Sequence, residues 1–442
     1  MIWAACFATS GFCRCPAFAR KRGVVQAIAA TLCLVSGRGG RVEHAARMSV
    51  QSFSWARAFV RPGAVVFATL FALDSMARSL LSNVVTLQAH RVLPNDRDVS
   101  LLFTCVGWAG IAATLFVPAL VRQFRPRWMY TIAAGMLCAA PMLLALGNLA
   151  GLVSGMLTRT FAAACLLNLL NLYIMAYIRK KDLARSEPLR TFFSAGAWTA
   201  GPLLGVLLFN QVSPMATFGL SAFSAVLLLV YFWWVRLEYG PALGPDEPVT
   251  TNPLPHIRRY LAQPRLVLAW LLNFGRETWW VTFFIYGFLY MLRIDDSGDI
   301  GALLISCGTA LLFVTPAAGW LARRFGMRRH LAAGYVLAGT AMLLAAAFFD
   351  RPWIVAGLLI LGALGAVNLD AVGFVPFLRA VRGRERPEMT MVFSIYRDAA
   401  GLVPTAIYSL LLSFFELSSV FIAAGIGVLG CACLCRYIPR GM

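Results

Sequence analysis

The sequence is poor in charged and titratable residues, and this scarcity excludes most soluble proteins. Only 13% of the residues are Asp, Glu, Lys or Arg, whereas 60% are hydrophobic. A water-soluble domain carries roughly twice as much charge, ~25%. Histidine is limited to four residues scattered along the chain, so no metal site is predicted. We therefore expect a membrane protein that needs no metal and no cofactor.

Nucleotide-binding motifs and a disulfide framework are also missing. The sequence has no P-loop, and its one dinucleotide-like segment, 425–430, lies inside an apolar run with no strand before it. That segment is predicted to be a helix-packing face. Most of the eleven cysteines lie in apolar runs, where a free cysteine behaves as a small hydrophobic residue. With no paired carboxylate motif or histidine cluster facing a membrane surface, we do not expect an enzyme.

Long apolar runs are what the sequence has instead. Crossing the ~30 Å hydrocarbon core takes about 20 apolar residues in a helix. Twelve such runs are predicted, at 62–87, 99–121, 128–146, 150–178, 189–209, 213–235, 265–291, 300–321, 329–348, 352–378, 389–412 and 415–435. Because the runs are continuous rather than alternating, they favour helices over barrel strands. The predicted fold class is an all-α polytopic membrane protein with twelve transmembrane helices.

The second half of the chain echoes the first. The matching positions are Asn168 and Asn368, Arg179 and Arg379, Phe193-Ser194 and Phe393-Ser394, and Gly201 and Gly401. Since each half has an even number of runs, both halves enter the membrane in the same direction. This predicts two six-helix bundles, 48–235 and 265–442, related by a pseudo-twofold axis along the membrane normal. A proline-rich cytoplasmic linker at 236–264 joins them, and 1–47 is expected to be a non-native or disordered extension before Met48.

The formal net charge of +20 would suit a nucleic-acid partner, but its placement indicates membrane topology. Basic residues gather in the loops on one side of the predicted membrane, for example at 122–127, 179–190 and 379–386, and acidic residues prevail in the opposite loops. This positive-inside pattern places both termini in the cytoplasm. We expect residence in the cytoplasmic (bacterial inner) membrane, with the lipid bilayer and no nucleic acid as partner.

The loop after the eighth run reads GWLARRFGMRR and resembles the cytoplasmic glycine/basic signature of the major facilitator superfamily. Its signature residues are Gly319, Arg323, Arg324, Gly326, Arg328 and Arg329. Arg323 stands where the family usually has Asp. The resemblance covers essentially 48–436. It implies a secondary transporter whose first, fourth, seventh and tenth helices line a central cavity.

Two further segments resemble proton-coupled drug exporters. Arg159 in the fourth run stands where those proteins carry an arginine. In the fifth run, Gly201-Pro202-Leu203-Leu204-Gly205 matches the core of their glycine-proline signature. The resemblance favours export. Gly201-x-x-x-Gly205 is equally a pattern for close helix packing.

Ionised side chains within the runs mark the candidate functional residues. A charge at the bilayer centre costs from ~2.5 to more than 10 kcal/mol unless it faces a cavity or a partner. The deep charges are Asp74, Arg78, Arg159, Arg276, Glu277, Asp370, Arg397 and Asp398. Four acids balance four arginines, as expected if they pair.

Asp74 and Glu277 are the proton-coupling candidates, because both are predicted to lie near the membrane midplane. Asp74 and Arg78 are four residues apart and share a helix face. They form either a static bridge or one that exchanges partners or a proton. Arg276 and Glu277 point about 100° apart, which predicts different partners. Glu277 is either a proton carrier or part of a fixed ion pair.

The candidates for lining a substrate cavity come from both halves: Arg78, Arg159, Asn168, Arg276, Trp280, Asn368 and Asp370. Arg159 is expected to bind either an anionic substrate group or a cavity acid. Trp280 shares a face with Arg276 and is placed to stack on a substrate.

Three other expectations concern partners and gating. Asp370 is predicted to pair with Arg397 or Arg78. Asn168 and Asn368, at equivalent depths, form either interhelical hydrogen bonds or parts of the cavity. Tyr396, Arg397 and Asp398 lie nearer the cytoplasmic end of their run and are candidates for a gate or an interface bridge.

Together these features predict a monomeric secondary transporter of a small molecule that works by alternating access, is driven by protons and leans towards export. Two alternatives stay open. One is a proton-coupled importer of the same fold, and the other is a non-transporting relative that serves as a sensor or scaffold.

Overall fold

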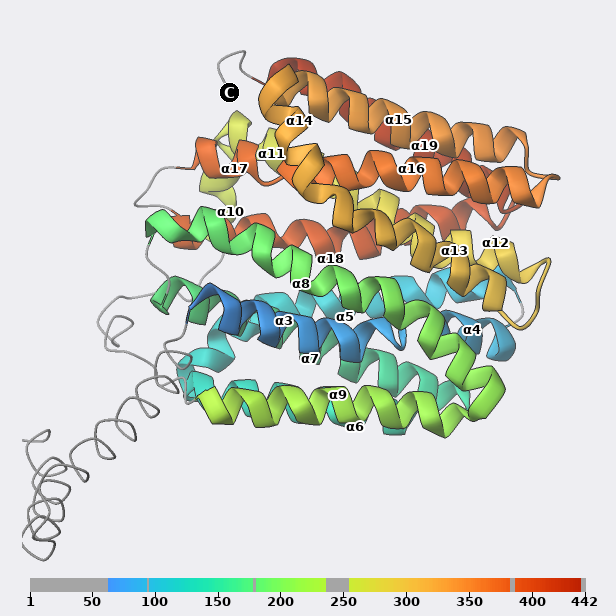
Figure 1. Ribbon diagram of the computed structural model, residues 1–442, viewed down its shortest axis with the longest axis horizontal. Helices are drawn as coiled ribbons and strands as arrows, with labels where there is room; N and C mark the ends of the chain where they lie inside the picture. Colours follow the sequence, from blue (N-terminus) through green and yellow to red (C-terminus); the bar gives the residue numbers. More distant parts are fainter. Residues whose placement is uncertain (1–62, 94, 178–179, 236–253, 382–385, 439–442) are drawn as a thin grey trace, which may run out of the picture. The chain divides into compact units, whose positions relative to one another are not determined.

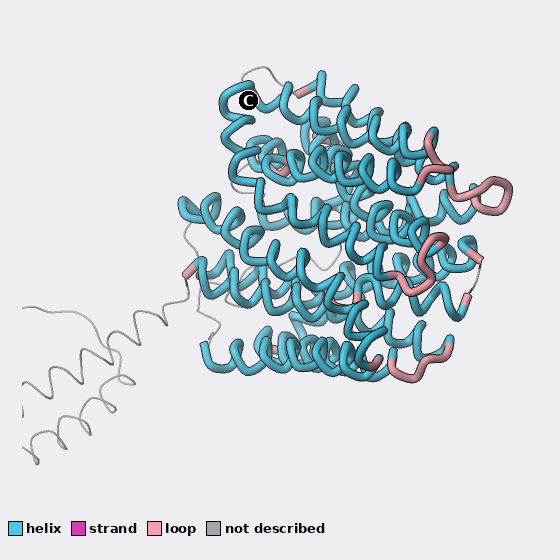
Figure 2. The backbone as a smooth tube through the Cα atoms, turned by 45° about the vertical axis from the view of Figure 1, so that its right-hand side comes forward, coloured by secondary structure: helices cyan, strands magenta, loops and turns pink. Residues whose placement is uncertain are grey.

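The structure, a computed structural model, describes residues 63–93, 95–177, 180–235, 254–381 and 386–438. Within these ranges the chain is helical and has no strand (Figures 1 and 2). The all-α class is therefore confirmed. The predicted extension at 1–47, the predicted start at Met48 and most of the predicted linker lie outside the described residues.

The first half forms a series of long helices. They are α3 (Ala64–Ser79), α4 (Ser82–Val92), α5 (Asp96–Gln123), α6 (Pro126–Leu144), α7 (Leu149–Tyr177), α8 (Lys180–Leu207), the π-helical turn η1 (Leu208–Val212) and α9 (Pro214–Val235). The predicted run 62–87 is divided at Leu80 and Leu81 into α3 and α4. α8 begins at Lys180, well before the predicted 189, because helical hydrogen bonding continues beyond the apolar run.

The second half repeats this series after a short helix, α10 (Leu254–Leu261), within the predicted linker. It comprises α11 (Pro264–Thr282), η3 (Phe283–Gly287), α12 (Phe288–Leu292), α13 (Asp299–Ala310), η4 (Leu311–Val314), α14 (Thr315–Phe325), α15 (Met327–Ala347), α16 (Pro352–Val372), α17 (Val375–Ala380), α18 (Arg386–Leu411), α19 (Ser418–Leu434) and η5 (Cys435–Tyr437).

Nine helical segments of the described residues are long and apolar enough to cross a membrane. They are α3–α4, α6, α7, α8–η1, α9, α13–α14, α15, α16–α17 and α19–η5. The segments α11–α12 and α18 carry the charged pairs Arg276–Glu277 and Arg397–Asp398, which lower their apolar content. These two and α5 occupy the three other predicted runs, so the count of twelve stays a prediction.

The helices pack around a hydrophobic cluster within the first half and a larger one that includes buried residues of both halves. In the first half, α3, α6, α7 and α9 enclose a core where the Tyr130 ring stacks on Phe232 with centroids 4.1 Å apart. In the second half, α15 packs on α16 and α19, and α11 packs on α19. Trp279 and Phe283 of the α11–η3 segment are fully buried there.

Four helices, which lie in the middle of Figure 1, make the most extensive contacts between the halves. α5 packs along α18, and α8 packs along α13. Each contact joins the second helical segment of one half to the fifth of the other, as a twofold relation between the halves requires. Small residues permit the close approach: a Cβ atom at Gly107 would lie 3.0 Å from the Leu402 Cα atom.

The glycine patterns of the sequence also serve helix packing. A Cβ atom at Gly425 would lie 3.0 Å from the carbonyl oxygen of Gly339, so the dinucleotide-like segment forms a helix contact. A Cβ atom at Gly205 would lie 1.9 Å from the Leu80 carbonyl oxygen, and one at Gly201 would lie 2.0 Å from Ser79 Oγ. The close-packing interpretation of Gly201-x-x-x-Gly205 is confirmed.

Candidate functional site

A cavity of ≈ 280 Å³ opens between the two halves, and its wall is charged. The wall consists of Arg78 from α3, Thr114 from α5, Arg159, Thr160, Ala163, Ala164, Leu167 and Asn168 from α7, and Ser394, Arg397 and Asp398 from α18. Three guanidinium groups and one carboxylate therefore face the same space as hydroxyl and amide groups. Such a wall can bind charged groups of both signs on a small molecule.

In the first half, α3 holds an ion pair at the cavity wall. Arg78 Nη2 lies 2.6 Å from Asp74 Oδ2, and Asp74 is only 3% exposed. The helical spacing of four residues places both groups on one face. The second carboxylate oxygen of Asp74, Oδ1, is buried and has no hydrogen-bond partner in the described part of the chain.

Arg159 on α7 lies beside this pair. Its Nη2 atom donates a hydrogen bond to the carbonyl oxygen of Arg78 at 2.9 Å. Its Nε atom is buried and has no hydrogen-bond partner among the described residues. Within the described residues, no carboxylate lies within salt-bridge distance of Arg159, so the expected pairing with a cavity acid is not seen there. The guanidinium lies at the cavity wall.

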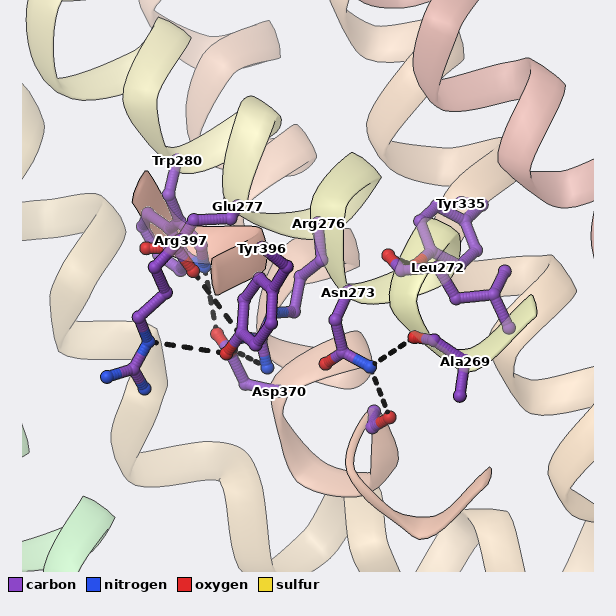
Figure 3. Close-up of polar contacts among 11 residues, drawn as sticks. Ala269, Leu272, Asn273, Arg276, Glu277, Trp280, Tyr335, Asp370, Tyr396 and Arg397 are labelled. Atoms are coloured by element: carbon purple, nitrogen blue, oxygen red, sulfur yellow. Dashed lines mark hydrogen bonds and ion pairs between the residues drawn. The ribbon is translucent and has the colours of Figure 1, made fainter. Parts of the chain in front are cut away.

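In the second half, Arg276 on α11 is the centre of a buried polar cluster (Figure 3). Its Nη1 atom lies 3.1 Å from Asp370 Oδ1, and its Nη2 atom donates to the Tyr396 hydroxyl at 2.9 Å. Trp280 Nε1 donates to the other oxygen of Asp370, also at 2.9 Å. The Phe374 ring centroid lies 5.3 Å from the Arg276 guanidinium carbon. The cluster thereby connects α11, α16 and α18.

Two sequence expectations about this cluster are wrong. Asp370 pairs with Arg276 rather than with Arg397 or Arg78, because α16 packs beside α11. Arg276 and Glu277 also share a contact, 3.4 Å between Nη2 and Oε2. The long arginine side chain can reach back across the 100° separation of the two positions, so Arg276 serves both acids.

Glu277 and Arg397 lie at the edge of the cluster. Arg397 Nε donates to the Tyr396 hydroxyl at 3.3 Å, so this hydroxyl accepts hydrogen bonds from both arginines. The Glu277 side chain is 26% exposed, whereas that of Arg276 is 4% exposed. Glu277 is therefore the acid of the cluster that is most open to water.

Asp398 makes the polar contact between the halves at the cavity. Thr114 Oγ1 on α5 donates a hydrogen bond of 2.7 Å to Asp398 Oδ2 on α18. The two residues come from opposite halves and lie on helices that pack along each other. Asp398 thus takes part in a hydrogen bond between the halves, and a gate or interface bridge at Tyr396–Asp398 stays a prediction.

The predicted cavity residues divide into two groups. Arg78, Arg159 and Asn168 line the cavity, and so do the gating candidates Arg397 and Asp398. Arg276, Trp280, Asn368 and Asp370 are not among its lining residues. Trp280 is 9% exposed and bonded to Asp370, so its ring is not free to stack on a ligand in this state. Matching positions of the repeat therefore lie in different surroundings, since Asn168 lines the cavity and Asn368 does not.

Asn168 and Asn368 make the same local contact in both halves. Asn168 donates to the Ala164 carbonyl oxygen at 2.9 Å, and Asn368 donates to that of Leu364 at 2.7 Å. Both bonds reach back four residues within one helix. The expected interhelical hydrogen bonds are not the ones observed, since each amide finds a nearer acceptor on its own helix.

Sequence reasoning missed Thr114, Thr160 and Ser394, which complete the cavity wall. Hydroxyl residues are common in apolar helices and usually bond to the backbone of their own helix. Their presence in the sequence therefore does not indicate which of them line a cavity. Only Ser394 was noticeable, through its echo of Ser194 in the repeat. Within the ranges that the structure describes, no group of three or more His, Cys, Asp and Glu residues is placed to hold a metal ion.

The comparison with known proteins decides the family. The chain matches the family model of the Major Facilitator Superfamily over residues 67–403. It belongs to this superfamily. Superfamily membership confirms the resemblance seen in the loop signature and makes the chain a multi-pass membrane transporter rather than an enzyme.

Solved structures of other superfamily-type transporters share this fold. A mutant of the nucleoside transporter NupG matches with a TM-score of 0.66 at 12% identity, over 85% of this chain and 99% of that one. A POT family transporter in complex with a thioalcohol-conjugated peptide matches with a TM-score of 0.67 at 12% identity, over 84% and 94%. At this identity the likeness shows the fold alone. No curated protein matches the chain in sequence.

The segment that resembles the superfamily signature spans the end of α14 and the start of α15. Gly326 separates the two helices with φ +87°, a left-handed conformation that favours glycine. Arg323, Arg324 and Arg329 are exposed, and the Arg324 guanidinium carbon lies 5.4 Å from the Trp320 ring centroid. The signature residues therefore form an exposed basic turn at one end of the bundle.

Proposed function

We propose that this superfamily member is a secondary active transporter that moves a small molecule by alternating access, is driven by protons and works in the direction of export. The observation that supports it is a charged cavity whose wall is shared by both halves. Arg78 and Arg159 come from the first half, and Arg397 and Asp398 from the second. A ligand between them contacts both halves and so acts on their relative arrangement.

Contacts at the ends of the helices support the idea of a gated cavity. At the end of the bundle predicted to face outside, Arg293 Nη2 lies 3.2 Å from Asp96 Oδ2 across the halves. At the same end, Asn210 donates to the Ser297 carbonyl oxygen at 2.7 Å. These polar contacts would have to break when the halves rock to open that side.

For proton coupling we propose Glu277 first and Asp74 second. Glu277 shares its arginine with Asp370 and is the more exposed of the two acids. A proton on Glu277 would leave the Arg276–Asp370 pair intact and neutral. Asp74 Oδ1 is buried and has no hydrogen-bond partner among the described residues, so it is the oxygen that would take the proton. A proton there would remove the negative charge that holds Arg78.

The direction of export is proposed on the resemblance of Gly201–Gly205 to an exporter signature. Because packing against α3 and α4 already accounts for these glycines, a proton-coupled importer is the alternative. A non-transporting sensor or scaffold is the other, since Arg323 replaces the usual acid of the loop signature. For localisation we propose the bacterial inner membrane, with both termini in the cytoplasm.

The test is ligand-driven proton movement in proteoliposomes loaded with a pH-sensitive dye. A transported compound should change the internal pH in vesicles with the wild-type protein and not in empty vesicles. Glu277→Gln should abolish the proton signal while labelled compound still exchanges. If Glu277→Gln and Asp74→Asn both leave pH-driven flux intact, the coupling proposal fails. If no compound in a broad panel moves, the scaffold alternative replaces transport.

A further inference from the structure

The cavity wall carries a positive and a negative group that the protein leaves apart. Within the described residues, neither Arg159 nor Asp398 forms a salt bridge, although Arg78 in the same wall is paired with Asp74. Arg397, the third arginine of the wall, forms none there either, but it donates a hydrogen bond to the Tyr396 hydroxyl. The buried Nε atom of Arg159 has no hydrogen-bond partner there. Such a group is costly to leave unpaired in a low-dielectric site, so its geometry is suited to an anionic partner from outside the chain.

Asp398 presents the complementary negative group. Thr114 occupies one carboxylate oxygen, Oδ2, with a hydrogen bond of 2.7 Å. The other oxygen, Oδ1, and Thr160 Cγ2 on α7 both lie near Gly110 on α5: a Cβ atom at Gly110 would be 3.5 Å from the oxygen and 3.2 Å from the methyl carbon. Thr160 follows Arg159 on the same helix. The free carboxylate oxygen and the arginine helix are therefore near neighbours across the cavity.

The charge balance of the membrane-embedded groups selects the class of ligand. Asp74, Glu277, Asp370 and Asp398 equal Arg78, Arg159, Arg276 and Arg397 in number. While all eight groups are ionised, a ligand with a net charge would leave an uncompensated charge in the membrane interior, which is unfavourable. A neutral ligand with separated charges would pair both Arg159 and Asp398 and keep the balance.

We propose that this cavity binds a small zwitterion, a molecule with one carboxylate and one ammonium group. Its carboxylate binds the Arg159 guanidinium, and its ammonium group binds Asp398 Oδ1. Thr160 and Asn168 in the same wall offer further polar contacts. The inference rests on the proposed function in taking this cavity as the transport site, whereas the binding itself is testable without transport.

Thermal stabilisation of the purified protein tests the class with two matched series of probes. One series is leucine, 4-methylpentanoate and 3-methylbutylamine, and the other is 4-aminobutyrate, butyrate and butylamine. In at least one series the zwitterion should raise the melting temperature, and neither singly charged analogue should do so at equal concentration. The inference is overturned if an amine or a carboxylate alone stabilises as well as the zwitterion, or if neither zwitterion binds.

Variants locate the two contacts. Arg159→Gln and Asp398→Asn should each weaken the Kd of the zwitterion roughly tenfold or more, because each loses a charge-assisted hydrogen bond. Arg159→Gln should also bind the zwitterion no better than the matching amine. Asp398→Asn should bind the zwitterion no better than the matching carboxylate. A variant that is merely misfolded would not exchange selectivity in this way. Arg351→Gln and Asp350→Asn, on an exposed turn, are matched controls and should bind as the wild type does.

The two proposals fail separately. Binding of a zwitterion without any flux in proteoliposomes would contradict the transport proposal and leave the ligand class intact. Flux of a singly charged compound that competes with no zwitterion would overturn the ligand class and leave transport intact.

Discussion

Arg276 Nη1 on α11 lies 3.1 Å from Asp370 Oδ1 on α16, and the two side chains are 4% and 16% exposed. The same guanidinium donates to the Tyr396 hydroxyl on α18. One arginine thus connects three helices of one bundle. In the repeat, Arg276 and Glu277 correspond to Ser75 and Met76 of the first half, which carry no charge. The bundle that holds Glu277 is therefore the one with the more constrained polar interior.

Removal of either partner of this pair should destabilise the protein strongly. Arg276→Met leaves Asp370 and Glu277 without their arginine, which costs about 3–5 kcal/mol. Asp370→Leu should cost less, because Arg276 keeps its 3.4 Å contact with Glu277. The melting temperature in detergent should fall for each single variant, and the double variant Arg276→Met/Asp370→Leu should recover part of the loss. Glu277→Gln, which removes only the 3.4 Å contact, is the control with a smaller effect. Equal melting temperatures for all four variants would contradict a structural role of the pair.

Close packing of α8 on the α3–α4 junction should not tolerate a side chain at Gly205. A Cβ atom there would lie 1.9 Å from the Leu80 carbonyl oxygen, so Gly205→Ala forces backbone shifts that cost about 1–3 kcal/mol. Gly196→Ala on the same helix meets nothing within 4 Å. It should be neutral or slightly stabilising, since alanine favours helix. Comparable melting temperatures of the two variants would show that the junction is looser than the structure indicates.

The Asp96–Arg293 bridge should bias the protein towards closure at the predicted outer end. The Arg293 side chain is 45% exposed, and an exposed ion pair stabilises by only about 0.2–1 kcal/mol. Arg293→Gln should therefore raise the population open at that end by a factor of up to about five. Modification of Cys placed at Ser100, beside Tyr286, reports the opening. Asp350→Asn, which leaves the bridge intact, is the control. If Arg293→Gln leaves the modification rate of this Cys unchanged, the Asp96–Arg293 bridge has no role in closure.

Asp295 should make the start of α13 sensitive to acid. A hydrogen bond from the Ser297 hydroxyl and others from backbone N–H groups hold the pKa of this carboxyl below its usual value of 3.8. Since the folded-state pKa is depressed, the stabilisation is present above the unfolded value and is lost as the pH falls below about 3.8.

Hydrogen exchange of the 297–302 amides measures this effect. Protection should decrease in the wild type between pH 5 and pH 3 after correction for intrinsic rates. Asp295→Asn should show lower protection at pH 5 and little further change. An identical pH dependence in both proteins would assign the transition to another group.

Particular residues show which contacts and which family the sequence predicts. The spacing of Asp74 and Arg78 predicted their contact, because residues four apart on a helix are neighbours whatever surrounds them. The loop GWLARRFGMRR predicted the superfamily, and the family match confirms it. The prediction of the partner of Asp370 was wrong, because the pattern within one helix does not show which helices pack beside it or how they are rotated. Thr114 gave no signal at all.

By itself, then, the sequence determined an all-α membrane transporter with a repeated architecture and a set of balanced deep charges. The lengths of apolar runs, the charge bias of the loops and short residue spacings are local properties, so they can be read without knowing how the helices pack. Only the tertiary structure decided which charges meet. It paired Arg276 with Asp370, brought Thr114 to Asp398 across the halves, and gave Arg159 no acid as a partner among the described residues. Those outcomes depend on the approach of distant helices, where differences of an ångström select one partner over another.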